Sequence, residues 1–489
     1  MVGERAPAVF HIASRQIFSF AGALNCDHSD IYNARTTNIA MLSSNSVQEV
    51  ADNAFIAHWA AVKGQHPFLH FYDGLRTSHE FHKIDLLEPE VVRENFPVAE
   101  AEEWRYKSAI KNNDPTISGS GCNNDLWWQI CEAQMPDRRN LPNVVEQGMD
   151  VLYNITGRRY HLFNYYGHPE AEHIIVMMGS GASTAQEVVE FLASKGERVG
   201  LVAVHLFRPF SVEHLLKVVP KTVKRVCVLD KAKENAAADP LCLDVQMAFS
   251  KAADDGLIER PMVVGGEYGI CGWEFQPKHV LAVLENLKTE KPRTRFIVGP
   301  IDDVSNTSLD LPKQIPVTLP QGTTECIFWS LGGDGTIGAN RAACDIIGTN
   351  TDFYSQAYFA FSPKKTGGEA VSFLRFGPSP IQSTYECTSA NYIAVHKAAL
   401  LHAFPNMLAP IREGGVFVLN CPWKTSAELA LNVPAHHLKM LAEKKAKVYT
   451  IDATMVAEQV GLRGRVNNVL QSVFSNFLKF SPLSKLCLF

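Results

Sequence analysis

Four glycines interrupt the segment 330–341 (SLGGDGTIGANR), which lies between an apolar run and a helix-like segment. Glycine lets a ligand approach the backbone closely, and the N–H groups at the start of a helix attract an anion. The segment therefore predicts a phosphate-binding loop, although a tight turn that binds nothing would show the same pattern. The candidate binding residues are Gly332, Gly333, Asp334, Gly335, Thr336 and Asn340.

Two other phosphate-bearing ligands fit this loop less well. A nicotinamide dinucleotide site needs an acidic residue about 20 positions further on at a strand end, which the sequence lacks. A thiamine diphosphate site of the Gly-Asp-Gly type needs a distant asparagine at the end of the following strand. Here Asn340 lies in the helix of the loop itself, and the strand-like segment 352–361 has no asparagine. We therefore favour neither ligand for the loop.

A second segment carries positive charge beside glycines. In 361–381 (FSPKKTGGEAVSFLRFGPSPI), Lys364 and Lys365 precede Gly367 and Gly368. By themselves, two lysines would indicate only a solvated surface turn. However, ammonium groups also bind phosphate. Together with the glycine loop they predict a ligand with several separated phosphates, so Lys364 and Lys365 join the candidate binding residues.

The elements that must position these residues follow from hydrophobic periodicity. In the first region we expect strands at 9–13 and 68–71, and a helix capped by Ser46 with Glu49 three residues later. The polar segment 98–143 predicts an irregular connection, followed by a helix over 143–156. The second region alternates strands and helices from residue 173 to about 289, which predicts a doubly wound α/β domain with a parallel sheet.

A proline-rich stretch, 310–322, predicts a linker to the third region. There we expect strands at 353–361, 371–376 and 416–419, and helices at 392–403 and 435–444. The whole chain is thus predicted to be α/β, in three regions.

Composition narrows the class of protein. The chain has 489 residues with 46 Lys and Arg against 51 Asp and Glu, a net charge of −5 without a long single-sign block. This pattern predicts neither a nucleic-acid partner nor a membrane surface. None of the 11 cysteines forms Cys-x-x-Cys, so no iron–sulfur or zinc motif is predicted. We expect a cytoplasmic protein, or one of the matrix of a mitochondrion-related organelle.

Three segments of the third region resemble one enzyme family. The stretches GGDGTIGANR, KKTGGEAVSFLRFGPSPI and IREGGVFVLN look like the gamma-type domain of pyruvate:ferredoxin oxidoreductase, a 2-oxoacid oxidoreductase. Upstream, DHSDIYNARTTNIAMLSSNSVQEVADNAFIAHWAA and PFLHFYDGLRTSHEFHKI resemble the first domain of that enzyme. GRRYHLFNYYGHPEAEHIIVMMGSGA and KTVKRVCVLDKAKE resemble its second domain.

The resemblance implies a domain organisation. It gives a truncated first, pyrimidine-binding-like domain of the thiamine-enzyme type over 1–160. A transketolase C-terminal-like domain follows over 161–312, and a gamma-type, coenzyme A-binding domain over 313–489. The phosphates at the glycine loop would then be those of coenzyme A.

The resemblance also implies a function. Family enzymes are homodimers that decarboxylate pyruvate oxidatively on thiamine diphosphate with Mg²⁺, pass electrons through iron–sulfur clusters and form acetyl-coenzyme A. The acceptor is ferredoxin, flavodoxin or, with an added flavoprotein, NADP. Arg15 in HIASR matches the arginine that faces the pyruvate carboxylate, although a surface arginine at a strand end is the alternative. Asn467 matches a position near coenzyme A.

Other polar residues have a structural interpretation. We expect the turn Asp73, Arg76, Ser78, His79 and Glu80 to form buried hydrogen bonds, and His205 and Arg208 to hold a strand end. We expect no counterpart in the sequence of the family's cysteine-rich cluster domain or of its thiamine-diphosphate-binding domain, which both lie further along the family enzyme. We therefore expect a part of such an enzyme, inactive towards pyruvate by itself. Alternatives are a non-catalytic module of a sulfite reductase flavoprotein and a subunit of a split enzyme.

Overall fold

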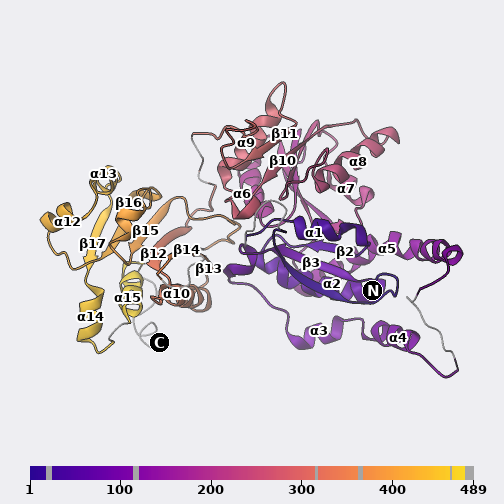
Figure 1. Cartoon of the computed structure of the whole chain (residues 1–489), viewed down its shortest axis with the longest axis horizontal. Coiled ribbons are helices and arrows are strands. Elements are labelled where there is room, and N and C mark those ends of the chain that lie inside the picture. The colour runs from indigo at the N-terminus through magenta and orange to yellow at the C-terminus, as the bar shows by residue number, and fades with distance from the viewer. Residues whose placement is uncertain are drawn as a thin grey trace. The chain divides into compact units, whose positions relative to one another are not determined.

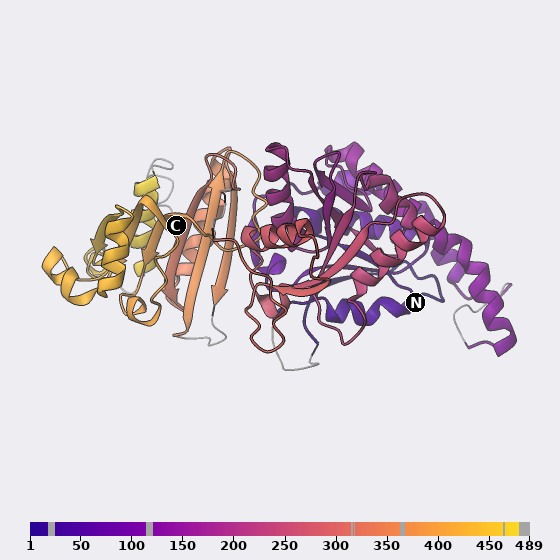
Figure 2. The same cartoon turned by 90° about the horizontal axis from the view of Figure 1, so that it is seen from above.

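The computed structural model of the protein describes residues 1–17, 25–113, 121–313, 316, 318–361, 367–462 and 465–478. The chain divides into two compact units. The first unit comprises Met1–Ser78, Ile84–Thr318 and Gln382–Tyr385, and the second comprises His79–Lys83, Leu319–Ile381 and Glu386–Phe489. Figures 1 and 2 show the elements from two sides. No helix in the described ranges combines the length and the apolar character that a membrane span requires.

The first sheet of the first unit has the order β1-β3-β2-β8 (Figure 1). Its strands are β1 (Val9–Ser14), β2 (Ala40–Ser43), β3 (Phe68–Asp73) and β8 (Leu206–Arg208). The first three are parallel, and β8 is antiparallel to β2. Helix α2 (Val47–Gly64) begins as predicted, because the Ser46 side chain accepts a hydrogen bond from the Glu49 N–H. The short elements α1 (Ser29–Ala34), η1 (Arg35–Thr37) and η2 (Thr77–His79) complete this region.

The prediction of an irregular connection over 98–143 is wrong. This segment contains helix α4 (Val98–Ser108) and most of the long helix α5 (Asn124–Thr156), with α3 (Pro89–Asn95) just before it. Pro136 and Pro142 lie inside α5. The second half of α5 packs its apolar face against α2, and this contact stabilises a helix that local propensity disfavours.

The second sheet has the order β11-β10-β9-β6-β7-β5. Five strands are parallel and β5 is antiparallel to β7, so the predicted parallel α/β region is confirmed. The strands are β5 (Phe163–Gly167), β6 (His173–Met177), β7 (Val199–Val204), β9 (Arg225–Asp230), β10 (Met262–Tyr268) and β11 (Arg295–Val298). The helices are α6 (Gly181–Ser194), α7 (Val212–Val218), α8 (Pro240–Asp254) and α9 (Pro277–Lys288), with the short η3 (Ile270–Gly272).

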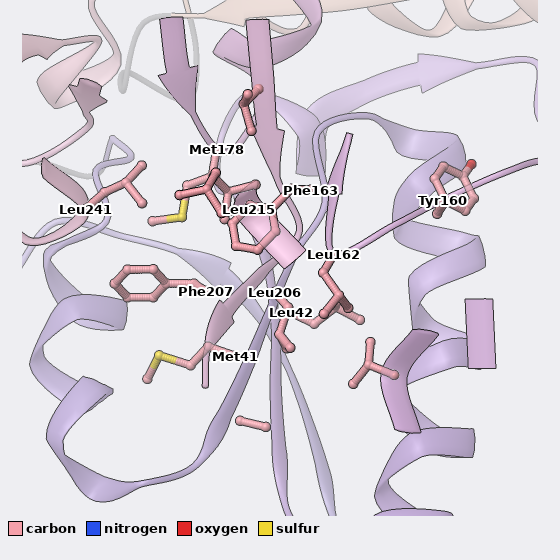
Figure 3. Close-up of a cluster of buried hydrophobic side chains, with 14 of the residues drawn as sticks. Met41, Leu42, Tyr160, Leu162, Phe163, Met178, Leu206, Phe207, Leu215 and Leu241 are labelled. Carbon is pink, nitrogen blue, oxygen red and sulfur yellow. The ribbon is translucent and has the colours of Figure 1, made fainter. Parts of the chain in front are cut away.

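One apolar core joins these two sheets. Figure 3 shows Met41 and Leu42 of β2 beside Leu206 and Phe207 of β8, with Phe163 of β5 nearby. All five side chains are buried. Because β8 leaves the second region to pair with β2, the first two predicted regions fold as one body.

The second unit contains a seven-stranded sheet of order β17-β16-β15-β12-β14-β13-β4. The strands are β4 (Glu80–His82), β12 (Thr324–Leu331), β13 (Tyr354–Phe361), β14 (Glu369–Gly377), β15 (Ala390–Val395), β16 (Ile411–Asn420) and β17 (Lys447–Ile451). Helices α10 (Thr336–Asn350) and α15 (Val466–Leu478) pack on one face, and α11 (Leu400–Ala403) and α13 (Ala435–Glu443) on the other. The remaining helices are α12 (Ser426–Asn432) and α14 (Ala453–Gln459).

The predicted helix over 392–403 is wrong, because this segment contains strand β15 and the short α11. Strand β15 pairs in parallel with both β12 and β16. A central parallel strand is covered on both faces and is therefore apolar throughout. Such a run cannot be told from a buried helix by periodicity alone.

Each sheet takes nearly all its strands from one predicted region. The exceptions are β8, which joins the first sheet, and β4, which joins the third. The boundaries at 160 and 312 stay predictions, because the compact units divide the long middle of the chain only at Thr318.

Candidate functional site

The glycine loop lies at a topological switch point of the third sheet. Strands β12 and β15 are parallel neighbours. After β12 the chain passes through α10 towards β13 on one side, whereas after β15 it continues to β16 on the other. In open α/β sheets, ligands bind in the crevice outside the carboxyl ends of the strands at such a point.

The loop holds its shape through glycines and Asp334. Gly333 and Gly335 have φ angles of 93° and 87°, which favour glycine. One carboxylate oxygen of Asp334 accepts a hydrogen bond from the Thr336 N–H at 2.9 Å, and the other from the Leu331 N–H at 3.2 Å. Each Asp334 oxygen therefore accepts one backbone hydrogen bond, and together these two bonds hold the shape of the loop.

His396 joins the loop from the neighbouring strand. It directly follows β15, it is 6% exposed, and its Nδ1 lies 2.8 Å from Thr336 Oγ1. Burial lowers the pKa of His396 to about 4, so the imidazole is neutral at pH 7. Its Nε2 has no hydrogen-bond partner within the described part of the protein, and neither has Nδ2 of the buried Asn340.

Two such buried polar atoms beside a helix start are available to a ligand. His396 was not among the predicted site residues, because its segment was assigned to a helix. A histidine at the carboxyl end of a strand would have been the signal.

The other predicted residues of this site divide into two groups. Asn467 lies at the start of α15 and next to Gly335. A Cβ atom added to Gly335 would lie 3.1 Å from Asn467 Cγ. Lys364 and Lys365 fall outside the described residues. The glycines after them pair with the loop, since the Gly332 N–H donates to the Gly368 carbonyl at 2.7 Å and the Gly367 N–H to the Gly332 carbonyl at 3.3 Å.

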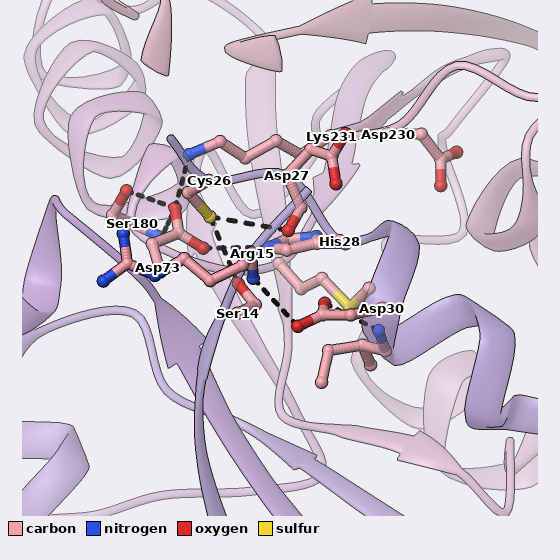
Figure 4. Close-up of polar contacts among 12 residues, drawn as sticks. Ser14, Arg15, Cys26, Asp27, His28, Asp30, Asp73, Ser180, Asp230 and Lys231 are labelled. Atoms are coloured by element: carbon pink, nitrogen blue, oxygen red, sulfur yellow. Dashed lines mark hydrogen bonds and ion pairs between the residues drawn. The ribbon is translucent and has the colours of Figure 1, made fainter. Parts of the chain in front are cut away.

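A second polar cluster surrounds Asp73 in the first unit (Figure 4). Asp73 ends β3 and Ser14 ends β1, while Ser180 follows β6 and Lys231 follows β9. The carboxyl ends of parallel strands from two sheets thus meet here. Arg15, the predicted substrate residue, directly follows β1 at the same edge.

Asp73 is the centre of this cluster. One of its oxygens lies 2.8 Å from His28 Nε2. The other accepts hydrogen bonds from Lys231 Nζ at 2.8 Å and from the Ser180 hydroxyl at 2.6 Å. All four side chains are buried, so the sequence brings a charged network into the interior.

Electrostatics keep the buried pair ionised. Burial by itself would raise the pKa of Asp73, but the Lys231 ammonium and the His28 hydrogen bond outweigh burial and hold this pKa well below its usual value. Burial would likewise lower the pKa of Lys231, yet the Asp73 carboxylate raises it. Burial raises the pKa of the nearby Cys26 thiol to about 12, which leaves it protonated and unreactive at pH 7.

Cys26, His28 and Asp73 lie close enough together to hold a metal ion. The Lys231 ammonium already supplies the positive charge beside Asp73. A divalent cation there would be repelled by this ammonium and would have to displace it. The cluster therefore does not fit a metal ion.

Arg15 lies at the edge of this cluster. Its backbone N–H donates to the Asp30 carboxylate at 2.8 Å. Its side chain passes close to Gly74, since a Cβ atom added to Gly74 would lie 2.9 Å from Arg15 Nε. Gly74 thus leaves room for the arginine, which is half-buried. Arg15 belongs to the first unit, whereas the glycine loop belongs to the second.

His205 and Arg208, which the sequence predicts to have structural roles, form polar contacts near strand ends. His205 lies 3.0 Å from the His161 carbonyl oxygen and 3.2 Å from the Glu49 carboxylate. Arg208 lies 2.8 Å from the Asp244 carboxylate. Lys231 and Ser180 were missed by sequence reasoning, because only the fold brings them to Asp73.

Comparison with protein families gives three matches in consecutive parts of the chain. Residues 1–150 match "Pyruvate flavodoxin/ferredoxin oxidoreductase, thiamine diP-bdg". Residues 171–280 match "Pyruvate:ferredoxin oxidoreductase core domain II", and residues 325–486 match "Pyruvate ferredoxin/flavodoxin oxidoreductase".

Curated relatives match almost the whole chain. The sequence is 43% identical over 486 residues to a pyruvate:ferredoxin oxidoreductase of Moorella thermoacetica, covering 99% of this chain and 41% of the relative. It is 41% identical to a pyruvate-flavodoxin oxidoreductase of Enterobacter agglomerans, with the same two coverages. It is also 41% identical to a pyruvate dehydrogenase [NADP(+)] of Cryptosporidium parvum, covering 99% of this chain and 25% of that relative. The chain therefore spans about two fifths or less of these relatives.

Solved structures give weaker likenesses. A 2-oxoglutarate:ferredoxin oxidoreductase from Magnetococcus marinus has a TM-score of 0.35 at 14% identity, covering 58% of this chain and 49% of that chain. A pyruvate oxidoreductase subunit from Thermotoga maritima has a TM-score of 0.28 at 19% identity, covering 34% and 82%.

Proposed function

Because the chain belongs to the pyruvate:ferredoxin/flavodoxin oxidoreductase family, we propose that it binds pyruvate and coenzyme A in an enzyme that converts them to acetyl-coenzyme A and carbon dioxide. The two electrons released would pass through iron–sulfur clusters to ferredoxin, flavodoxin or an NADP-linked flavoprotein. The chain spans 41% of the relative from Moorella thermoacetica, so the complete activity is part of the proposal.

The observation that carries the coenzyme A proposal is the switch point with its two buried, unpartnered polar atoms. Asn340 Nδ2 is a donor, and neutral His396 can donate from Nε2 while its Nδ1 accepts from the Thr336 hydroxyl. Donors beside a helix start suit phosphate oxygens. The loop backbone, Asn340, His396 and Asn467 would hold coenzyme A here, with Lys364 and Lys365 as predicted contacts to its phosphates.

Arg15 is proposed to bind the pyruvate carboxylate. A guanidinium can donate two parallel hydrogen bonds to a carboxylate, and this geometry fixes the orientation of the substrate. The Asp73–Lys231 pair joins the end of β9 to the end of β3, and β3 pairs with β1, the strand that Arg15 follows. Thiamine diphosphate would supply the carbon nucleophile of the complete enzyme. The Asp73 cluster does not fit its magnesium ion, so we assign no residue of this cluster to that cofactor.

Two substitutions of His396 test the coenzyme A site in the full chain. Asparagine reaches the position of Nδ1 and can keep the bond to Thr336, whereas glutamine reaches the position of Nε2. If Nε2 contacts the ligand, calorimetry should show at least tenfold weaker coenzyme A binding for His396→Asn, since about 1.4 kcal/mol is one decade. His396→Gln should lose less.

The matched control is His402→Gln, an exposed histidine on α11 of the same unit. It should bind coenzyme A as the unmodified chain does. Absence of coenzyme A binding by a folded chain, or equal affinities for His396→Asn and His402→Gln, would contradict the site.

A further inference from the structure

The first unit contains a pocket that belongs to neither site described above. Its volume is about 560 Å³, within the range of small-ligand sites. Its lining comes from η1 and the turn after it, the turn before β3, helix α5, the end of β8, the β8–α7 connection with the start of α7, and α8. Segments far apart in the sequence thus form one concave surface inside a single compact unit.

The lining is strongly basic. Four arginines contribute to the pocket, Arg35, Arg138, Arg139 and Arg208, against one acidic residue, Asp244. The chain as a whole carries a net charge of −5, so this concentration of positive charge is local. Clefts lined by one sign of charge attract ligands of the opposite sign.

Two of the four arginines already have carboxylate partners. Arg208 lies 2.8 Å from Asp244 and Arg35 lies 3.2 Å from Glu234. Arg138 donates only to the neutral Gln134 amide, at 2.8 Å, and within the described ranges neither Arg138 nor Arg139 forms an ion pair. Among the described residues, these two guanidinium groups of the pocket therefore have no carboxylate partner.

Most of the remaining lining is apolar and indicates the other half of the ligand. Met135, Leu141 and Pro142 line the pocket from α5, while Phe210 and Val212 line it from the β8–α7 connection. Arginine binds phosphate in a bidentate manner. A ring or other apolar group on the same ligand could pack against Phe210.

We propose that this pocket binds a nucleotide, with its phosphates at Arg138 and Arg139 and its base on the apolar side. This site is separate from the switch point of the second unit. Its occupancy would neither require nor replace coenzyme A at His396.

ADP is the probe, titrated by calorimetry into the full chain. The double substitution Arg138→Gln/Arg139→Gln should weaken ADP binding at least tenfold, because charge-assisted hydrogen bonds to phosphate are lost. Affinity should also fall as salt is raised. Pyrophosphate, which lacks the base, should bind more weakly than ADP.

The matched control is Arg93→Gln, an exposed arginine on α3 of the same unit. It should leave ADP affinity unchanged. Glutamine favours helix, so the double variant should fold, and its melting temperature checks this. Amide hydrogen exchange supplies a second measurement, since bound ADP should protect residues 135–142 and 208–212.

Three results would overturn the proposal. The first is no ADP binding by the folded chain, and the second is an equal loss of affinity in the double variant and in Arg93→Gln. The third is ADP binding without protection of 135–142, which would place the nucleotide elsewhere. Equal affinities for ADP and pyrophosphate would refute the assignment of the base to the apolar side.

Discussion

At the scale of single residues, the buried pair Asp73–Lys231 decides the stability of the first unit. Replacing Lys231 with methionine would leave the Asp73 carboxylate buried beside His28 without its cation. Removing one partner of a buried ion pair costs about 3–5 kcal/mol. We expect Lys231→Met to lower the free energy of unfolding by that amount, as measured by denaturant titration.

The double variant Asp73→Asn/Lys231→Met removes both charges and should recover most of the loss. The comparison variant is Lys224→Met, whose exposed ammonium lies 2.9 Å from Glu172. An exposed pair contributes at most about 1 kcal/mol. If Lys231→Met were no more destabilising than Lys224→Met, the Asp73 cluster would not have the assigned role.

At the scale of elements, three histidines connect β1, β3 and α2. His11 Nδ1 lies 2.8 Å from His70 Nδ1, and His11 Nε2 lies 3.2 Å from His58 Nε2. Burial lowers the pKa of all three, and that of His70 to about 3. The three imidazoles are therefore neutral at pH 7.

The pH dependence of stability follows from these lowered pKa values. Below the unfolded-state pKa of about 6.5, the unfolded chain binds protons that the folded chain excludes. The free energy of unfolding should therefore fall as pH drops from 6.5 towards 5, by up to about 1.4 kcal/mol per pH unit for each excluded proton. The variant His70→Asn should show a shallower dependence in urea titrations at several pH values.

Buried carboxylates act in the opposite direction and make this comparison necessary. Burial raises the pKa of Asp230 to about 7, which favours the folded state as pH falls. Both proteins contain Asp230, so its contribution cancels when the pH dependence of the free energy of unfolding of His70→Asn is subtracted from that of the unmodified chain. Identical slopes for His70→Asn and the unmodified chain would refute the role of the cluster.

At the scale of the whole molecule, the first half of α5 presents apolar side chains to solvent. Trp127 and Trp128 are 57% and 66% exposed, and Leu126 and Ile130 lie beside them. Exposed apolar groups of this kind promote association. We expect the chain to self-associate, and Trp127→Ser/Trp128→Ser to shift light scattering towards the monomer mass.

Circular dichroism should show unchanged helix content in this variant. The control Trp273→Ser removes an exposed tryptophan away from α5 and should leave the mass distribution as it was. A monodisperse monomer of the unmodified chain at every concentration would contradict the prediction.

The sequence by itself determined the fold class, the parallel second sheet and the glycine loop between a strand and a helix. These features depend on local patterns. The patterns are the strand and helix periodicities, the Ser46 cap, and the glycines whose positive φ angles form the tight turn of the loop. The role of Asn467 at coenzyme A stays a prediction, and the structure places this residue beside Gly335 of the loop. Local chemistry is sufficient for such features because neighbours in sequence are neighbours in space.

Only the tertiary structure decided the rest. It made β15 a strand, because partners on both sides supply its hydrogen bonds. It extended α5 through two prolines by packing that helix on α2. It brought Lys231 to Asp73 across 158 residues and His396 to Thr336 across 60. Such contacts depend on strand order, and the spacing of residues along the chain does not encode it.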